Sequence, residues 1–323
     1  MIKTAVTEIL GIQHPIIGGT MMSITDADFA AAISNAGGLG ILASAIYKTR
    51  DDFAAAIDRV QELTDRPFAV NINLFPAMTA IDNNIYIDVM AEKGVKIVET
   101  SGHSAPEELY PRFKDAGMTW IHKCVGARYA RKAESMGADI VTVVGYENGG
   151  ATGKLDIGTL VLVPTVVDAV NIPVIGGGGV SDGRGLLSLL GLGAQAVIIG
   201  SRLLVTKECP IHENLKQALL NATELDTRLI MRSIGATHRV WDNAAAKKCA
   251  DIETRGGDFN EVISVVAGDK ARQMYATGDL EAGVISCGQG IGLVKDIPTV
   301  KELFDRMVEE AKETLERISA MRI

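Results

Sequence analysis

The sequence has few cysteines and no close cysteine pair, which argues against a zinc knuckle or a disulfide framework. The four cysteines lie far apart in the chain: Cys124, Cys209, Cys249 and Cys287. Isolated thiols are typical of a reducing compartment, so we expect a cytoplasmic protein with no metal site. No uncharged apolar run approaches the ~18 residues that span a bilayer. The opening residues, MIKTAVTEIL, also lack the apolar core of a signal peptide.

Positive charge and aromatic residues are also scarce. Lys and Arg number 32 against 40 Asp and Glu, which gives a formal net charge of −8 and argues against sequence-independent binding of nucleic acid. We therefore expect a small molecule as the partner, neither nucleic acid nor membrane, and the chain is compatible with a homodimer. Aromatic residues make up only 5% of the chain, whereas glycine numbers 34 of 323 residues. This balance favours buried parallel strands packed closely against helices.

Eight short apolar runs, each followed by a turn and a helical segment, occupy the first two-thirds of the chain. They are rich in Val and Ile, and their starts are roughly 20–35 residues apart, the length of a helix and two loops. The runs are Pro15–Ile17, Leu39–Leu42, Phe68–Ile72, Val95–Val98, Thr119–Ile121, Ile140–Val144, Val174–Ile175 and Ala196–Ile199. Eight such units predict an α/β fold, a (β/α)8 or TIM barrel, over residues 1–208.

After the eighth run the sequence becomes more polar and loses its alternation. We predict a C-terminal helical lobe over residues 209–290, beside the catalytic face of the barrel. The last segment, 291–323, contains an amphipathic stretch with a charged face from Thr299 onward. We expect it to form a helix that packs back on the barrel.

The predicted seventh and eighth strands end in glycine-rich turns, where barrels of this kind commonly bind phosphate. Residues 176–183 read GGGGVSDG, and residues 200–202 read GSR. Glycines let the backbone approach a phosphate closely, so that successive N–H groups can donate to its oxygens. Other predicted strands end in amide, hydroxyl or ammonium side chains, which could hold the polar edge of a flat ring. A flavin mononucleotide and a phosphosugar both remain open at this point.

Several segments resemble the nitronate monooxygenase (2-nitropropane dioxygenase) family of FMN-dependent barrels. They include GIQHPIIGGTMM, ISNAGGLGILAS, VKIVETSGH, IPVIGGGGVSDGRGL and LIMRSIGATHRVWDN. That family also includes NADH:quinone reductases and flavin-type enoyl-ACP reductases. The segments IHKC, TKECPIH and LIMRS are most similar to the bacterial NADH:quinone reductase branch. The resemblance implies an FMN-dependent oxidoreductase for which NAD(P)H is the expected co-substrate.

The resemblance also implies a set of site residues. The residues expected to bind the cofactor are Thr20, Met21, Met22, Asn73, Lys123, Gly150, Gly178, Gly179, Gly200 and Ser201. Among them, Thr20, Met21 and Met22 should lie along the isoalloxazine ring, Asn73 should contact its polar edge, and the last four should hold the phosphate. We expect His103 and Lys123 to serve in catalysis. Strand alternation predicts that Lys123 faces the pocket and that His122 faces away from it.

One departure from the family pattern bears on the reaction. After the sixth strand the family usually carries Glu-x-Gly-Gly-His-x-Gly, whose His removes a proton from a nitroalkane. Here the segment is ENGGATG, and Ala151 stands at the His position, where it cannot transfer a proton. Hydride transfer from NAD(P)H to flavin needs no such His. We therefore rank reduction of a quinone or an enoyl-type acceptor above nitronate oxidation, and a catalytically impaired flavin-binding barrel after both.

The sequence leaves some points open. It does not distinguish NADH from NADPH, name the substrate, or show which group replaces the missing His. His14, His212 and His238 are expected to be structural. A cluster of arginines, Arg228, Arg232 and Arg239, could bind an anionic substrate such as a CoA thioester or could be solvated surface charge.

Overall fold

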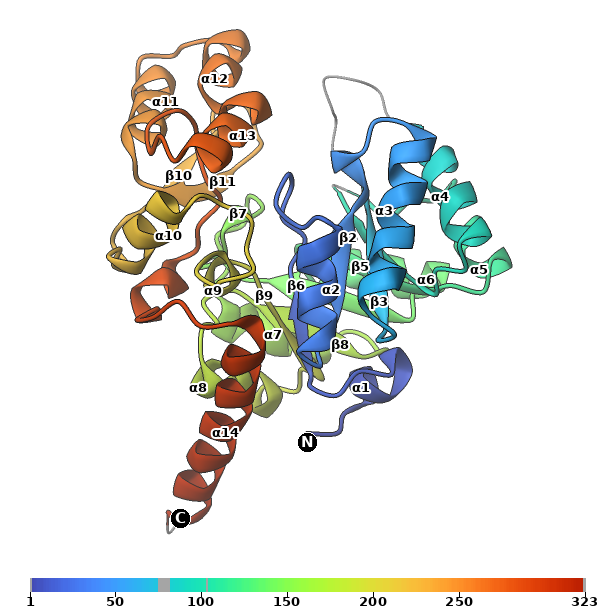
Figure 1. The fold of residues 1–323 in the computed structure, drawn as a ribbon. Coiled ribbons are helices and arrows are strands. Elements are labelled where there is room, and N and C mark those ends of the chain that lie inside the picture. The colour runs from blue at the N-terminus through green and yellow to red at the C-terminus, as the bar shows by residue number, and fades with distance from the viewer. Residues whose placement is uncertain (1, 75–81, 103, 322–323) are drawn as a thin grey trace.

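The computed structural model describes residues 2–74, 82–102 and 104–321, and their centre is an eight-stranded parallel barrel surrounded by helices (Figure 1). The strands are β1 (Ile16–Gly18), β2 (Gly40–Ala43), β3 (Phe68–Asn73), β4 (Ile97–Ser101), β5 (Thr119–Cys124), β6 (Ile140–Val144), β8 (Val174–Gly177) and β9 (Ala196–Ile199). Their order is β1-β9-β8-β6-β5-β4-β3-β2, and a parallel bridge between Ile17 and Leu39 joins the two ends. The predicted (β/α)8 fold is confirmed.

The barrel strands are buried on both faces, as their continuous Val- and Ile-rich sequences predict. Side chains that point into the barrel form one apolar cluster, which includes Ile17, Ile41, Ile97, Ile121 and Ile198. Side chains on the outer face pack instead against the surrounding helices in a larger cluster. This alternation decides which side of each strand reaches the barrel mouth.

Helices follow most of the strands. They are α1 (Ala5–Leu10), α2 (Ala27–Asn35), η1 (Ser44–Ile46), α3 (Arg50–Leu63), α4 (Asn83–Glu92), α5 (Tyr110–Asp115), α6 (Ala127–Met136), α7 (Thr159–Val167), α8 (Gly183–Gly191) and α9 (Ser201–Leu204). Several begin at side chains that accept a hydrogen bond from the first turn, for example Thr49 before α3 and Asp182 before α8. Among the described residues no helix has both the length and the apolar character needed to cross a bilayer.

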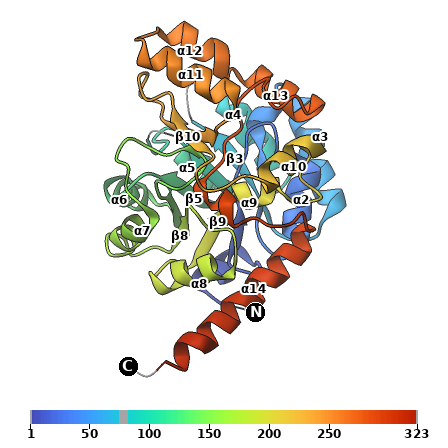
Figure 2. The ribbon, with the colours of Figure 1, turned by 90° about the vertical axis from the view of Figure 1, so that its left-hand side faces the viewer.

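The sequence predicts a helical lobe after the barrel, whereas the lobe in the structure contains a β-hairpin as well as helices. Its helices are α10 (Glu213–Leu220), α11 (Ala244–Thr254), α12 (Phe259–Val266) and α13 (Gly268–Thr277). Strands β10 (Thr227–Ile230) and β11 (His238–Trp241) pair antiparallel, and β11 also pairs with β7 (Gly150–Ala151), which lies just after β6. The lobe has its own small apolar core and rises over one side of the barrel mouth (Figures 1 and 2).

The chain returns to the barrel through η2 (Gln289–Leu293) and ends in the long helix α14 (Val300–Ser319). Thr299 and Glu302 form a reciprocal capping box at its start. The apolar face of α14 packs against α8 and α2, along the outside of the barrel (Figure 2). The helix α14 therefore contacts two helices that surround the barrel.

Candidate active site

Polar side chains replace the apolar interior of the barrel at the carboxyl ends of the strands. On β4, Ile97 belongs to the interior cluster, so Glu99 and Ser101 point to the same side. The parallel register places Asn71 beside Glu99, and Asn73 beside Ser101. Two successive layers of polar side chains therefore line the barrel mouth: a lower layer with Asn71 and Glu99, and an upper layer with Asn73 and Ser101. Beneath them the apolar interior cluster fills the barrel like a plug. The mouth is the usual place for a site in this fold.

The lower layer is connected by hydrogen bonds that cross the barrel. Thr20, which follows β1, donates from Oγ1 to Glu99 Oε2 at 2.8 Å, and Asn71 Nδ2 donates to the same oxygen at 2.8 Å. Asn71 Nδ2 also donates to Ser101 Oγ at 3.1 Å. No local sequence pattern shows that Thr20, after β1, reaches Glu99 on β4.

Lys123 lies on the inner face of β5, where its register neighbours are Ser101 and Thr142. It is half-buried and forms no ion pair with any residue that the structure describes. Thr142 is fully buried, and its hydroxyl has no hydrogen-bond partner within the described chain. The Lys123 ammonium group, which has no acidic partner among the described residues, can donate to polar atoms of a bound ligand.

His122 and Cys124 lie on the opposite face of β5 from Lys123. The His122 ring packs near Trp120, and its Nδ1 is 2.8 Å from Thr100 Oγ1, which also accepts from Trp120 Nε1. Burial lowers the pKa of His122 to about 4 and raises that of the Cys124 thiol to about 12. Neither group is available to a ligand at the mouth, and the predicted inward orientation of Lys123 agrees with the structure.

The remaining residues expected near the ring lie at or beside the mouth, except that His103 falls outside the described residues. Asn73 is the last residue of β3. Met21 packs against the main apolar cluster, whereas the side chain of Met22 is exposed. The turn that carries them is fixed by Thr25, whose Oγ1 accepts from Met21 N at 2.7 Å.

The glycine turns after β8 and β9 fit the phosphate end of a flavin mononucleotide. Gly178 and Gly179 have φ values of +104° and +77°, which L-residues with side chains rarely adopt. A Cβ added to Gly178 would lie 2.5 Å from Thr159 Oγ1, whereas one added to Gly200 would meet no atom within 4 Å. The backbone at Gly200 therefore borders open space, next to Ser201 at the start of α9. Backbone N–H groups that are exposed between two turns can donate hydrogen bonds to an anion such as a phosphate.

A segment near the C-terminus holds these turns in place, and sequence reasoning did not identify it. Gly288 N donates to Ser201 Oγ at 2.7 Å, and Ser181 Oγ donates to the carbonyl oxygen of Gly290 at 2.7 Å. Gln289 N donates to the carbonyl oxygen of Glu147 at 2.9 Å. The segment 288–290 thus contacts the loops after β6, β8 and β9 together.

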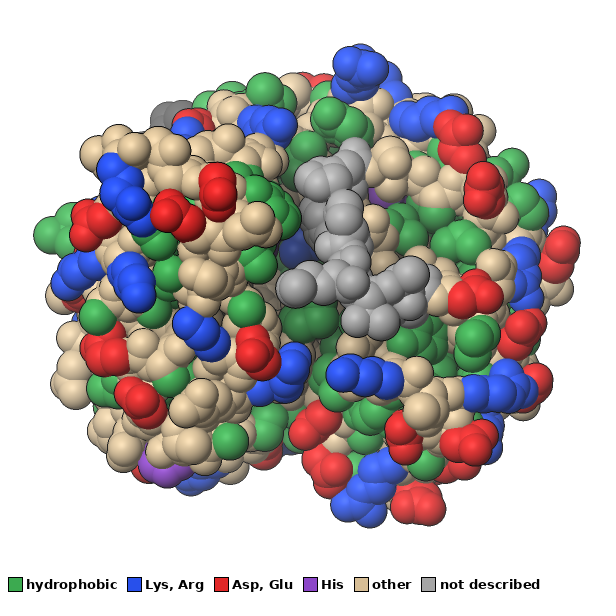
Figure 3. Space-filling model, turned by 90° about the horizontal axis from the view of Figure 1, so that it is seen from above, with side chains coloured by type: hydrophobic (Ala, Val, Ile, Leu, Met, Phe, Trp, Pro, Cys, Tyr) green, Lys and Arg blue, Asp and Glu red, His purple; other side chains and the backbone are tan. Residues whose placement is uncertain are grey.

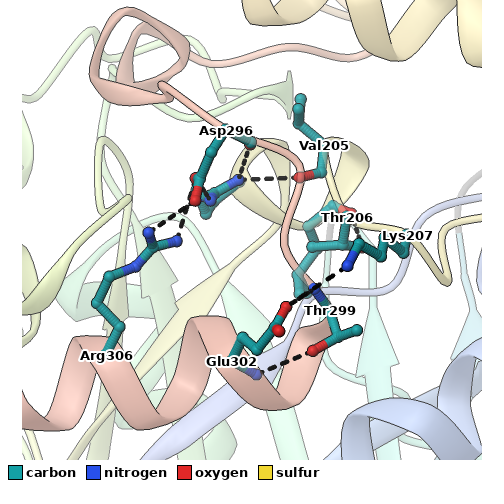
Figure 4. A network of polar contacts seen from close by, with 9 residues as sticks. Val205, Thr206, Lys207, Asp296, Thr299, Glu302 and Arg306 are labelled. Atoms are coloured by element: carbon teal, nitrogen blue, oxygen red, sulfur yellow. Dashed lines mark hydrogen bonds and ion pairs between the residues drawn. The ribbon is translucent and has the colours of Figure 1, made fainter.

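A buried arginine attaches α9 to the same C-terminal region (Figure 4). The Arg202 guanidinium is 3% exposed and donates to Asp296 Oδ1 at 2.8 Å and to the carbonyl oxygen of Val205 at 3.0 Å. Arg306, on α14, donates to Asp296 Oδ2 at 2.7 Å. Burial lowers the pKa of Arg202 to about 10, so it stays charged at neutral pH. The helix that follows the Gly200 turn is therefore fixed by a charge network.

The lobe closes the other side of the mouth. Gly150 and Ala151 form β7, with Ala151 opposite His238 and Gly150 opposite Arg239 on β11. His238 donates from Nδ1 to the carbonyl oxygen of Ala236, and burial lowers its pKa. Seen from above, the surface is hollowed between the lobe and the β2–α5 side of the barrel (Figure 3).

All three arginines of the predicted cluster are engaged within the protein. Arg228 pairs with Asp242, and Arg232 pairs with Asp156. Arg239 is buried, lies 4.5 Å from the centre of the Tyr146 ring, and donates to the Tyr146 carbonyl oxygen. These pairings favour structural roles over binding of an anionic substrate.

Comparison with known proteins gives consistent results over the whole chain. A family model described as nitronate monooxygenase matches residues 3–310. The chain is 34% identical to "(3aS,4S,5R,7aS)-5-hydroxy-7a-methyl-1-oxo-octahydro-1H-indene-4-carboxyl-CoA dehydrogenase" of Mycobacterium tuberculosis, over 99% of each chain. It is 30% identical to a probable nitronate monooxygenase of Bacillus subtilis, over 93% of this chain and 95% of that one. Among solved structures, FabK from Thermotoga maritima superposes with a TM-score of 0.90, at 34% identity and 99% coverage of both chains.

Proposed function

The chain belongs to the nitronate monooxygenase family of flavin-dependent oxidoreductases, and on that premise we propose that it passes a hydride from NAD(P)H to an enoyl-type or quinone acceptor. The observation that carries this choice within the family is Ala151 on β7, because a methyl group offers no base for removing a proton from a neutral nitroalkane. The CoA thioester named for the Mycobacterium tuberculosis relative favours a thioester-linked enoyl acceptor over a quinone.

The residues of the mouth divide into two groups in this proposal. The backbone of Gly178, Gly179 and Gly200, with Ser201, would hold the phosphate of FMN. The second group, Thr20, Asn73 and Lys123, would hold the polar edge of the ring, with the Lys123 ammonium as the charged donor. When bound, FMN supplies two-electron transfer between the two substrates.

The protein itself contributes orientation and exclusion of water. The apolar plug beneath Asn71 and Glu99 closes the barrel from below, so substrates must enter from the mouth between the barrel and the lobe. Lys123 provides an ammonium group on the inner wall that can donate to a carbonyl oxygen or to the ring. Fixed donors in a partly buried site orient a ligand without reorganising.

The test is anaerobic stopped-flow reduction of the FMN-loaded protein by NADH, NADPH and propyl-2-nitronate in parallel. The proposal expects the flavin absorbance to bleach with one of the pyridine nucleotides and to reoxidise on addition of an enoyl thioester or a quinone. Bleaching by the nitronate alone would instead identify a nitronate monooxygenase. A flavin that no donor reduces would indicate a catalytically impaired flavin-binding protein, and a colourless protein that takes up no FMN would refute all three.

A further inference from the structure

The lower polar layer contains a buried carboxylate that the proposed reaction does not use. Glu99 is 1% exposed and points into the barrel, and both hydrogen bonds that it receives end on Oε2. No Lys, Arg or His nitrogen of the described residues forms an ion pair with it within 4 Å. A buried carboxylate with hydrogen bonds but no cation is costly to keep, because its charge is removed from water without an opposite charge nearby.

The position of Glu99 relates this charge to the mouth. Along β4 it lies two residues below Ser101, which is level with Asn73 and Lys123 in the parallel register. One of its hydrogen-bond donors is Thr20, which comes from β1 and is itself partly exposed at the mouth. The carboxylate therefore lies one layer below Asn73 and Lys123, which are expected to contact the flavin ring. It also accepts a hydrogen bond from Thr20, another residue expected near the ring.

We propose that Glu99 is a positioning residue that lowers the reduction potential of the flavin, through its charge and through its hydrogen bond to Thr20. This inference rests on the proposed function. Reduction would make a bound isoalloxazine ring more electron-rich, and a nearby anion in a poorly solvated site would raise the energy of that form more than the energy of the oxidised form. A lower potential favours departure of electrons from the flavin, which suits a protein that delivers a hydride to an acceptor.

The test is the midpoint potential of bound FMN in the wild type and in Glu99→Gln, measured anaerobically against a reference dye. A glutamine whose amide oxygen takes the place of Oε2 accepts both existing hydrogen bonds, so the substitution removes the charge and keeps these two contacts. We expect the ratio of reduced to oxidised flavin at a fixed potential to rise at least about tenfold, equivalent to about 30 mV for a two-electron couple. Glu92→Gln is the matched control, because Glu92 is an exposed residue on α4 paired with Arg50, and we expect its potential to match the wild type.

A second variant, Thr20→Val, keeps the carboxylate but removes the hydroxyl that donates to it. With one fewer donor the charge is less offset, so the potential should move in the opposite direction, below that of the wild type. Loss of packing alone would not give opposite shifts in the two variants. Should Glu99→Gln fail to bind FMN, an unchanged or raised potential in Thr20→Val would overturn the proposal.

The outcomes also separate this inference from the proposed function. A wild type that binds FMN and is reduced by a pyridine nucleotide, but whose potential is the same in Glu99→Gln, would refute the role of Glu99 alone. A wild type that takes up no FMN would refute both.

Discussion

The buried imidazole of His122 should make the stability of the protein depend on pH between about 6.5 and about 4. Its side chain is 1% exposed on the outer face of β5, and burial lowers its pKa from 6.5 to about 4. Between these values the unfolded chain binds a proton that the folded protein excludes, so the free energy of unfolding falls as the pH falls. The shift of about 2.5 units corresponds to about 3 kcal/mol below pH 4, of which about 2 kcal/mol is lost by pH 5.

The assay is urea denaturation of the wild type and of His122→Asn at pH 7.5 and pH 5.0, at one fixed FMN concentration. Asparagine retains a polar group near the position of Nδ1, within reach of Thr100 Oγ1, but does not titrate. The variant loses some packing at both pH values, so the informative quantity is the change between them. We expect the wild type to lose about 2 kcal/mol more than the variant on acidification. Equal losses in the two proteins would refute this reasoning.

Three further predictions concern the mouth. Gly200→Ala should leave the melting temperature unchanged, because a Cβ at this position meets no protein atom within 4 Å. The same Cβ would occupy the space expected for the phosphate, so FMN binding should weaken at least about tenfold in a fluorescence titration. Gly191→Ala is the control, because its Cβ at the end of α8 is equally unobstructed, and it should not weaken FMN binding. Lys123→Met should leave the fold intact, since Lys123 has no ion pair among the described residues. It should slow anaerobic flavin reduction at least about tenfold, and an unchanged rate would contradict the proposed role of Lys123. Ala151→His should raise oxygen consumption with neutral nitroethane at least about tenfold, and no gain would show that the missing base does not limit that reaction.

The barrel could be predicted from sequence because its strands are local signals. A strand buried on both faces appears as a continuous apolar run, and the run Ile140–Val144 coincides with β6. The hairpin of the lobe gives no such signal. Strands β10 and β11 have only four residues each, and they contain the charged residues Arg228 and Arg239. The third strand of their sheet, β7, precedes them by more than seventy residues in the sequence. Such short polar strands are specified by distant pairing, which sequence periodicity does not record.

The same distinction applies to the site. Glycine turns and inward-facing residues such as Lys123 follow from strand position and alternation, so they could be named before the structure was known. The hydrogen bond from Thr20 to Glu99 joins the ends of β1 and β4, which are three strands apart around the barrel, and only the closed sheet brings them together. The arginine cluster shows the converse case, since residues that look free in the sequence, such as Arg232, have acidic partners far along the chain.

The mouth of the barrel is completed by a part of the chain that lies outside the barrel in sequence. The segment 288–290 contacts three mouth loops, and a Cβ added to Gly288 would lie 2.6 Å from the carbonyl oxygen of Glu147. Because Ser201 at the start of α9 accepts from Gly288 N, the geometry of the predicted phosphate turn depends on this later segment. The segment contains the first residues of η2 and lies between α13 of the lobe and α14. The loops that we expect to hold FMN are therefore held by the stretch of chain that joins the lobe to α14.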